Sequence, residues 1–390
     1  MRKAILISDS FKGTLTTFDI IELFKKAYDE VFPESELLTF PVSDGGEGFV
    51  DSISTILKGK KVETNTTDSN GFPITAAYFI DEENQAYIEC ASCLSLPKTR
   101  YKNPGITSSY GVGFLIEDAI KRGVKHIYLS LGGTSTNDCG TGLLSVLGMR
   151  FSYEEEGDDW SIPIGESLGF VKRIDTRKLD SFTKGIKFTL LSDVKNPLLG
   201  ENGCTYVFAR QKGARESDLE KLESGMKSFH DLTVESGYPD YSSTEGAGAA
   251  GGIGCGMMTF LSAEMKSGIN AYLEMIHFEE YLKDVDMIFT GEGHIDSQTK
   301  EGKVIDGICS LARKHHIPVI ALVGGASKDS EAMMKEGLSS VIPINRELIS
   351  KREIGKKAKE NYYLTALNVL RLIKASEEMK NKQKRLQSFR

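Results

Sequence analysis

One local pattern recurs along this chain and constrains its fold more than any other feature: a strand, a polar loop containing glycine, and then a helix. The first unit runs from an apolar strand over residues 3–8 through Asp9-Ser-Phe-Lys-Gly13 into an amphipathic helix. The second joins a strand over residues 36–42 to a helix over 49–57 through Ser43-Asp-Gly-Gly-Glu-Gly48. Because similar units recur near the end of the chain, the pattern predicts an α/β fold with parallel strands.

The segment from Val285 to Lys303 repeats the pattern with the densest set of polar groups. An apolar strand over residues 286–290 stops at Gly291 and Gly293, which allow backbone conformations closed to other residues. The acids, amide, hydroxyl and lysine that follow are Glu292, Asp296, Gln298, Thr299 and Lys303. Because ligands bind beyond the carboxyl ends of strands in open α/β sheets, we expect these side chains to line a ligand site.

The middle of the chain is less regular, with short β-rich pieces from about residue 61 and a short strand expected over residues 204–209. Because strand–helix units at both ends bracket this stretch, we predict two α/β domains, one inserted in the other. The outer domain is expected to combine residues 1–70 and 280–390. The inserted domain, which carries several glycine-rich loops, is expected to span residues 71–279.

Composition argues against several classes of function. The formal net charge of −7 is unlike that of a nucleic-acid-binding protein, and no apolar run suggests a membrane span. The N-terminal strand starts at once and lacks the features of a signal peptide, so we expect a cytoplasmic protein. The six cysteines are scattered, and the Cys90-Ala-Ser-Cys93 pair lacks the second pair that a structural zinc site needs, which predicts reduced, buried thiols. The basic tail Lys380–Arg390 is expected to be a solvated terminus.

Several loops share glycines, one or two carboxylates, an amide or hydroxyl, and a lysine, and this composition suits phosphate together with a divalent cation. Backbone N–H groups at glycines and helix N-termini attract phosphate oxygens, while carboxylates hold Mg²⁺ directly or through water. The lysines Lys12, Lys212 and Lys303 are placed to neutralise charge on a transferred phosphoryl group. Two interpretations stay open for Asp138, which is either a ligand contact or only the N-cap of a helix that begins near Gly142.

Other catalytic designs fit less well. Gly246-Ala-Gly-Ala-Ala-Gly251 matches the dinucleotide-binding GxGxxG pattern, but the residues before it resemble a loop and not a strand. The chain has no GxxxxGK[ST] phosphate loop, no HRD or DFG kinase signature and no GxSxG nucleophile elbow. A phosphotransferase with this sequence therefore belongs to neither of the two commonest designs.

The loop motifs together resemble those of the type 1 glycerate kinases, in the same order and over nearly the whole chain. The matching segments are Asp9-Ser-Phe-Lys-Gly13, Pro41-Val-Ser-Asp-Gly-Gly-Glu-Gly48, Gly132-Gly-Thr-Ser-Thr-Asn-Asp138, Asp193-Val-Lys-Asn-Pro-Leu198, Gln211-Lys-Gly-Ala214, Gly246-Ala-Gly-Ala-Ala-Gly-Gly252, and Gly291-Glu-Gly-His-Ile-Asp-Ser-Gln-Thr299 with Gly302-Lys303. Departures are few, such as Cys139 where the family usually has glycine, and none removes an acid or a lysine.

The resemblance implies ATP-dependent phosphorylation of D-glycerate, commonly at the 2-hydroxyl, to give 2-phosphoglycerate. It also implies two α/β domains, one flavodoxin-like (Rossmann-like) and one resembling restriction endonucleases, with one inserted in the other. The implied cofactors are ATP and Mg²⁺. The implied partner is a small-molecule substrate, with no nucleic acid and no membrane, and the oligomeric state is left open.

One hypothesis for the site follows, with Mg-ATP and D-glycerate in a cleft between the domains. Asp193 is expected to accept the proton of the attacking hydroxyl, and Lys12, Lys212 and Lys303 are expected to contact phosphate. Contacts to substrate or nucleotide are assigned to Asp9, Ser10, Gly132, Gly133, Asn137, Asp138, Gly251, Gly252, Gln298 and Thr299. Contacts to the metal are assigned to Asp44, Glu47, Glu292 and Asp296.

Three alternatives stay open. These are phosphorylation of the 3-hydroxyl, NAD-dependent dehydrogenation of a small hydroxy acid, and sensing of glycerate or nucleotide without turnover. No arginine in the loops is an obvious clamp for the carboxylate of glycerate, because only Arg210 and Arg215 adjoin a motif. The backbone amides at Gly132-Gly133 or Gly251-Gly252 are the other candidates.

Overall fold

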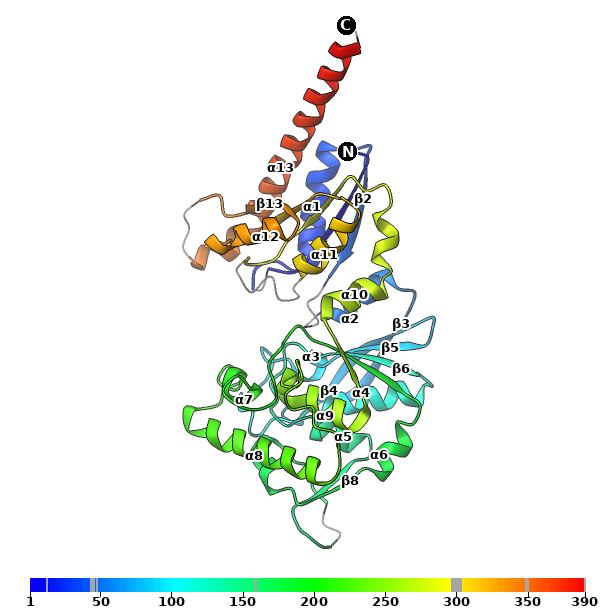
Figure 1. Cartoon of the computed structure of the whole chain (residues 1–390), viewed down its shortest axis with the longest axis vertical. Coiled ribbons are helices and arrows are strands. Elements are labelled where there is room, and N and C mark those ends of the chain that lie inside the picture. Colours follow the sequence, from blue (N-terminus) through cyan, green and yellow to red (C-terminus); the bar gives the residue numbers. More distant parts are fainter. Residues whose placement is uncertain are drawn as a thin grey trace. The chain divides into compact units, whose positions relative to one another are not determined.

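The computed structural model describes residues 1–11, 13–42, 46, 48–157, 160–295, 304–347 and 351–388 (Figure 1). The chain has an α/β structure that groups into two compact units. Unit 1 combines Met1–Asp44 with Ile269–Arg390, and unit 2 spans Gly45–Gly268. The sequence prediction set these boundaries near residues 70 and 280, whereas the structure includes β3 (Gly59–Thr67) in the sheet of unit 2.

Unit 1 contains a five-stranded sheet in the order β13-β12-β11-β1-β2. Every neighbouring pair of strands is parallel, as the alternation of strands and helices predicted. The strands are β1 (Lys3–Ser8), β2 (Glu36–Pro41), β11 (Met287–Thr290), β12 (Val319–Val323) and β13 (Leu338–Pro343). β1 and β12 are buried almost throughout, which explains why both are continuous apolar runs in the sequence.

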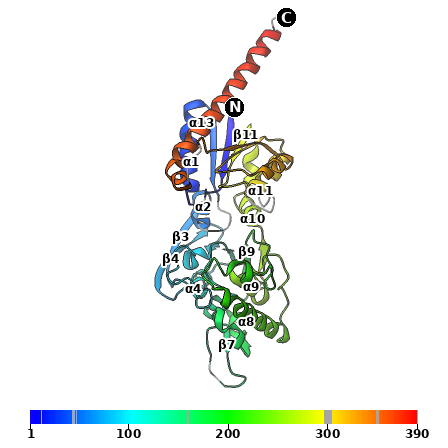
Figure 2. The same cartoon turned by 90° about the vertical axis from the view of Figure 1, so that its left-hand side faces the viewer.

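Two helices cover one face of this sheet, α1 (Thr17–Val31) and α13 (Lys351–Ser388), which lie side by side (Figures 1 and 2). Thr16 caps the N-terminus of α1, and its side chain accepts a hydrogen bond from the N–H of the third helical residue, Asp19, in a capping box. Its apolar side faces the sheet, and the rings of Phe24 and Phe289 lie 4.7 Å apart between centroids. Apolar spacing along α1 thus determines which face it buries.

The remaining helices of unit 1 connect its later strands and include α11, whose apolar residues are buried while its last turn carries basic side chains. A glycine within α11, Gly307, lies close to Ile269, because an added Cβ there would lie 3.0 Å from the Ile269 side chain. The helices are α10 (Gly268–Met275), α11 (Val304–Lys314) and α12 (Ala332–Lys335).

Unit 2 contains a six-stranded sheet in the order β10-β9-β6-β5-β4-β3. The strands β5, β6, β9 and β10 run parallel, while β3, β4 and β5 form an antiparallel meander. Two short strands, β7 and β8, form a separate antiparallel pair. Besides β3, the strands of unit 2 are β4 (Pro73–Asp81), β5 (Gln85–Glu89), β6 (His126–Ser130), β7 (Arg150–Ser152), β8 (Arg173–Asp175), β9 (Lys187–Leu191) and β10 (Glu264–Lys266).

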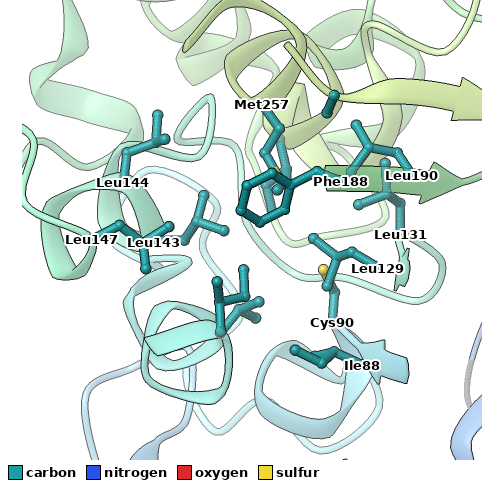
Figure 3. Close-up of a cluster of buried hydrophobic side chains, with 14 of the residues drawn as sticks. Ile88, Cys90, Leu129, Leu131, Leu143, Leu144, Leu147, Phe188, Leu190 and Met257 are labelled. Carbon is teal, nitrogen blue, oxygen red and sulfur yellow. The ribbon is translucent and has the colours of Figure 1, made fainter. Parts of the chain in front are cut away.

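The core of unit 2 forms where strands and helices meet. Figure 3 shows Ile88, Leu129 and Phe188 from the sheet packed with residues of α5 and α9, including Leu143 and Met257. The helices are α2 (Phe49–Ile56), α3 (Ala91–Leu94), α4 (Tyr110–Lys121), α5 (Thr141–Val146), α6 (Arg177–Phe182), α7 (Cys204–Phe208), α8 (Glu216–Glu235) and α9 (Ile253–Leu261).

The strand expected over residues 204–209 is wrong, because this segment forms the short helix α7. The Val207 N–H donates to the Gly203 carbonyl at 3.1 Å, and the Ala209 N–H donates to the Thr205 carbonyl at 3.0 Å. Its β-branched residues suggested a strand, but Val207 is 42% exposed and the alternate burial of a strand is missing. Local hydrogen bonding has overridden the propensity of the residues.

All six cysteines are buried and unbridged, as the sequence predicted. In the described part of the chain, no helix has the length and apolar character needed to cross a bilayer.

Candidate active site

The sheet of unit 1 has a topological switch point between β1 and β11. From β1 the chain continues to β2 on one side, and from β11 it continues to β12 and β13 on the other. Counted within the unit, the strand order is 2-1-3-4-5, and ligands of such sheets bind outside the carboxyl ends of the strands at the switch point. The residues that follow β1 and β11 are therefore the first candidates for a site.

The loop after β1 is attached to the end of β11. The Asp9 N–H donates to the carbonyl of Gly291 at 3.0 Å, and the Ser8 hydroxyl donates to the same carbonyl at 3.1 Å. The Asp9 carboxylate accepts the N–H of Ser10 at 2.7 Å, which orients the Asp9 side chain. Thr17, the first residue of α1, donates its hydroxyl to the Ser8 carbonyl at 2.8 Å. These bonds place Asp9 and Ser10 at the switch point, as the sequence predicted for strand-end loops.

Gly291 and Glu292 continue β11 into the same region. A Cβ on Gly291 would lie 2.1 Å from the Leu322 carbonyl oxygen, so only glycine fits there. Glu292 is 6% exposed, and its carbonyl accepts the N–H of Gly324, which follows β12, at 3.1 Å. The Asn345 amide in turn donates to the Gly324 carbonyl at 2.8 Å. Gly324 and Asn345 were missed by the sequence reasoning, although both follow predicted strands.

Several residues assigned from the sequence lie outside the described residues. These are Lys12, Asp44, Glu47, Asp296, Gln298, Thr299 and Lys303.

In unit 2 the parallel strands end in step, so the loops that follow them share one edge of the sheet. The Cys90 N–H donates to the Ser130 carbonyl at 2.9 Å, and the Leu131 N–H donates to the Leu191 carbonyl at 3.1 Å. Gly132 and Gly133 come next, and Gly133 has a φ of +72°, which favours glycine. This edge is the second place where the structure gathers predicted site residues.

Asp138 is fully buried in the loop after β6, and its carboxylate accepts hydrogen bonds from Ser109, Gly140 and Gly142. Oδ2 accepts the N–H and the hydroxyl of Ser109, both at 2.7 Å, and Oδ1 accepts the N–H of Gly140 at 3.2 Å. Ser109 immediately precedes α4, so the carboxylate stabilises the start of that helix from 29 residues away in the sequence. Burial raises the pKa of the Asp138 carboxyl above its ordinary value, partly offset by these hydrogen bonds. Of the two interpretations of Asp138, the geometry favours a capping role, both at α4 and at α5, the helix near Gly142 whose N-terminal N–H groups at Gly140 and Gly142 also donate to the carboxylate.

Lys212 is a buried cation beside the same loop, with 3% of its surface exposed. Its ammonium donates to the Thr136 carbonyl at 2.7 Å, and burial lowers the pKa of this ammonium to about 8. Asn137, the next residue, is also fully buried and donates its amide to the Thr205 hydroxyl at 3.3 Å. The Asn137 Oδ1 atom has no hydrogen-bond partner within the described ranges. A buried cation and an unused buried acceptor thus flank Thr136, which is unusual unless a ligand or water completes the network.

The glycine-rich segment 246–252 packs against this loop. A Cβ on Gly251 would lie 2.0 Å from the Thr136 carbonyl oxygen, and the Cys139 N–H donates to the Gly251 carbonyl at 3.1 Å. Gly252 has a φ of +90°, and Cys139 itself has a φ of +53°, which fits a position where glycine is usual in the resembled family. The segment follows turns and not a strand, so it does not form a dinucleotide-binding fingerprint.

Asp193 follows β9 on the same edge of the sheet and is half-buried. Its Oδ1 accepts the Ser267 hydroxyl at 2.9 Å and the Gly268 N–H at 2.8 Å, where α10 begins. The carboxylate is therefore oriented by the N-terminus of α10.

Glu89 was missed by the sequence reasoning, although it ends β5 on this edge. It is 9% exposed, and its Oε2 accepts the N–H groups of Gly48 and Val50 at 3.1 and 3.2 Å. These donors lie at the N-terminus of α2, which Glu89 stabilises. The available signal was an acid at the end of an otherwise apolar strand.

Comparison with known proteins agrees with these observations. A family model described as the glycerate kinase family matches residues 4–374. A Bacillus cereus protein described as glycerate kinase is 35% identical over 96% of this chain and 99% of its own length. An Escherichia coli protein described as glycerate 2-kinase is 32% identical over 94% of this chain and 97% of its own length. The crystal structure of a glycerate kinase 2 from Salmonella typhimurium LT2 covers 97% of this chain and 99% of that one, with a TM-score of 0.83 and 31% identity.

Proposed function

The chain belongs to the glycerate kinase family, and from that premise we propose that it transfers the γ-phosphoryl group of ATP to the 2-hydroxyl of D-glycerate, giving 2-phosphoglycerate. Relatives over nearly the whole chain are kinases of glycerate, so the chain is an enzyme of this class. The observation that supports the 2-position best is the match to the Escherichia coli relative, which is described as a glycerate 2-kinase.

We further propose that unit 1 is the flavodoxin-like domain and unit 2 the domain that resembles restriction endonucleases. The strand order 2-1-3-4-5 of unit 1, with all pairs parallel, supports the first assignment. The mixed sheet of unit 2, with a meander on one side and parallel strands on the other, is compatible with the second.

The switch point of unit 1 is the proposed place for Mg²⁺ and the phosphates of ATP. Mg²⁺ is usually held by one or two carboxylates together with substrate phosphates, so Asp9 and Glu292 supply a sufficient donor set. Within the described ranges no group of three metal-binding side chains is found. When bound, Mg²⁺ would neutralise charge on the phosphates. The acids Asp44, Glu47 and Asp296 are proposed as further ligands from the sequence alone.

The loop edge of unit 2 is the proposed place for glycerate. Lys212, with a pKa of about 8, is mostly protonated at neutral pH and attracts an anion in a water-poor environment. Asn137 Oδ1 is free to accept a hydroxyl of the substrate, and the backbone near Gly132 and Gly133 offers N–H donors. These contacts would replace the missing arginine clamp for the carboxylate.

Phosphoryl transfer needs little covalent chemistry from the protein, so positioning and charge neutralisation dominate. Asp193 is proposed to accept the proton of the attacking hydroxyl, which contributes about 10²–10⁴-fold. Its orientation by Ser267 and Gly268 keeps the carboxylate fixed. Lys12 and Lys303 are proposed to contact phosphate, and Gln298, Thr299, Ser10, Gly251 and Gly252 to contact substrate or nucleotide.

A coupled assay tests the proposed reaction. The purified chain is incubated with D-glycerate, ATP and Mg²⁺, and ADP release is followed; a parallel reaction contains NAD in place of ATP and is followed by absorbance. We expect ADP release that requires both glycerate and Mg²⁺, and no NADH. Release of ADP without a requirement for Mg²⁺ would remove the metal assignment, and NADH formation would favour a dehydrogenase.

A further inference from the structure

Cys139 has a backbone conformation that suits glycine better than a residue with a side chain. Its φ is +53°, in the left-handed region that costs energy for any residue with a Cβ. Such a conformation at a candidate site is a reason to look for a role of the side chain. Neither the fold nor the proposed reaction uses the thiol of Cys139.

Cys139 packs against the first turns of α9, the helix that carries Cys255. A Cβ on Gly252 would lie 3.3 Å from the Cys139 Sγ atom, and a Cβ on Gly256 would overlap the Cys139 carbonyl oxygen. Positions 252, 255 and 256 share one side of the helix, because residues three and four apart are neighbours on a helix surface. Cys139 therefore lies against the side of α9 on which Cys255 is placed.

The two thiols interact directly. The Cys139 thiol donates a hydrogen bond to the Cys255 sulfur, which raises the pKa of Cys139 and lowers the pKa of Cys255, although burial opposes the second change. The Thr259 hydroxyl lies 3.9 Å from the same sulfur. Because the thiolate is the form that reacts with peroxides, Cys255 is the more reactive thiol and Cys139 lies beside it.

The other four cysteines have different surroundings. Burial raises the pKa of Cys90 above its ordinary value, and it raises the pKa of Cys93, Cys204 and Cys309 to about 12. Cys90 lies among the apolar side chains of the core of unit 2 (Figure 3). Cys90 and Cys93 thus provide an internal control, a second pair of buried cysteines in which the unreactive protonated form is favoured.

We propose that Cys139 and Cys255 form an oxidisable pair, which hydrogen peroxide converts into a disulfide and a thiol reductant restores. The Cys255 sulfur attacks one peroxide oxygen and the O–O bond breaks, giving a sulfenic acid and one water. The Cys139 sulfur then attacks the Cys255 sulfur, and the S–O bond breaks as the S–S bond forms, releasing a second water. In total the two thiols lose two electrons and two protons, and the peroxide is reduced to two waters.

The burial of the pair limits the oxidant to a small molecule. Cys139 and Cys255 each keep only 3% of their surface exposed. Hydrogen peroxide is close to water in size, whereas a bulky organic hydroperoxide or a disulfide such as oxidised glutathione requires a wider opening. We therefore expect hydrogen peroxide to oxidise the pair and oxidised glutathione to leave it reduced.

The disulfide would join two segments that meet at the loop edge of unit 2. Cys139 continues the loop after β6, which carries proposed glycerate contacts, and Cys255 follows the glycine-rich segment 246–252. These segments already pack without spare room, because a Cβ on Gly251 would overlap the Thr136 carbonyl oxygen. Contraction of the contact should therefore shift the loop and lower turnover by about tenfold or more. This effect, unlike the disulfide itself, rests on the proposed function.

Peptide mapping of the full-length protein tests the pair. Reduced wild type is treated with hydrogen peroxide, unfolded in denaturant with an alkylating agent, digested without reduction and examined by mass spectrometry. We expect a linked peptide pair that joins positions 139 and 255 and disappears after dithiothreitol, with Cys90 and Cys93 alkylated as thiols. Cys139→Gly, which suits the backbone there, should form no link and should instead be labelled by dimedone at Cys255. Absence of the 139–255 link in wild type, or a Cys90–Cys93 link formed as readily, would overturn the proposal.

ADP release before and after oxidation tests the effect on turnover. Wild type should lose activity about tenfold and regain it with dithiothreitol, whereas Cys139→Gly should keep its activity under the same treatment. Equal loss in the two proteins would overturn the link between this disulfide and turnover. If the reduced protein released no ADP at all, the proposed function would fail, while the peptide map would still decide whether the pair is oxidised.

Discussion

The loops at the carboxyl edges of the two sheets position their charged residues in different ways. In unit 1 the backbone places the acids, since the Asp9 N–H and the Glu292 carbonyl are bonded to neighbouring strand ends. In unit 2 the side chains themselves are held, since the Asp138 carboxylate and the Lys212 ammonium are both buried and hydrogen-bonded. Parallel topology alone is enough to bring the acids of unit 1 together at strand ends, whereas the charged residues of unit 2 are positioned by buried polar contacts between distant segments.

Unit 2 contains two buried charged side chains, and their surroundings differ. Asp138 accepts hydrogen bonds from Ser109, Gly140 and Gly142, which offset part of the cost of its burial. Lys212 has one acceptor, the Thr136 carbonyl, and its lowered pKa shows that burial disfavours its charged form. A residue that lowers stability in this way is more easily explained by function than by folding.

The largest effect is expected for Lys212→Met. Turnover of glycerate should fall by about 10²–10³-fold, because a charge-stabilising donor in a water-poor site is lost. The free energy of unfolding should stay within about 1 kcal/mol of wild type, because the lost hydrogen bond is offset by removal of a buried charge. Steady-state kinetics and urea denaturation measure the two quantities, with the exposed Lys227→Met as control. A variant that unfolds more easily yet keeps wild-type turnover would mean that Lys212 stabilises the fold and does not take part in the reaction.

Asp138→Ala should show the opposite balance. Removing the carboxylate leaves the donors of Ser109 and Gly140 buried and unpaired, which should lower the free energy of unfolding by about 3 kcal/mol. Urea denaturation measures this loss, and Asp231→Asn, which alters an exposed ion pair, should change stability by less than about 1 kcal/mol. Equal stability of Asp138→Ala and wild type would contradict the capping role.

The pH dependence of stability tests the same contrast. The pKa of Lys212 is about 8 in the folded protein and 10.5 as the ordinary value, so the unfolded chain binds more protons between these values. The free-energy cost of burying the charged ammonium is therefore fully present below pH 8. The free energy of unfolding rises as the pH increases from 8 towards 10.5. Wild type should gain about 3 kcal/mol over Lys212→Met across this window. If the free energies of unfolding of the two proteins changed in the same way with pH, the pKa of the Lys212 ammonium would not be lowered by burial.

The smallest effect is expected for Glu89→Gln. The amide still accepts one hydrogen bond but loses the charge at the N-terminus of α2, so stability should fall by about 1 kcal/mol. Thermal denaturation measures the change, and the exposed Glu82→Gln is the matched control. A loss no larger than that of the control would mean that Glu89 does not hold this helix.

Local patterns in the sequence predicted much of unit 1. The strand expected over residues 3–8 is β1, and the strand expected over 36–42 is β2 with one residue fewer. Both depend on continuous apolar runs, which the parallel sheet buries. Asp9, Ser10 and Glu292 could be placed at strand ends for the same reason.

The contacts of unit 2 could not be predicted in this way, because they join segments far apart in the sequence. Ser109 is the partner of Asp138, and Thr136 is the partner of Lys212 across 76 residues. Neither burial nor a lowered pKa can be inferred from a lysine in a glycine-containing motif. The helix at 204–208 was missed because its β-branched residues favour a strand, whereas local backbone hydrogen bonds form a helix there.

The position of the transferred phosphoryl group is the most direct test of the proposed reaction. The product formed from D-glycerate and Mg-ATP is examined by phosphorus and proton NMR, which distinguishes the two isomers by coupling of the phosphorus to one or two protons. The account predicts 2-phosphoglycerate, whose phosphorus couples to the single proton on C2, in amounts equal to the ADP released. A product whose phosphorus couples to the two protons on C3, or the absence of any phosphorylated glycerate, would contradict it.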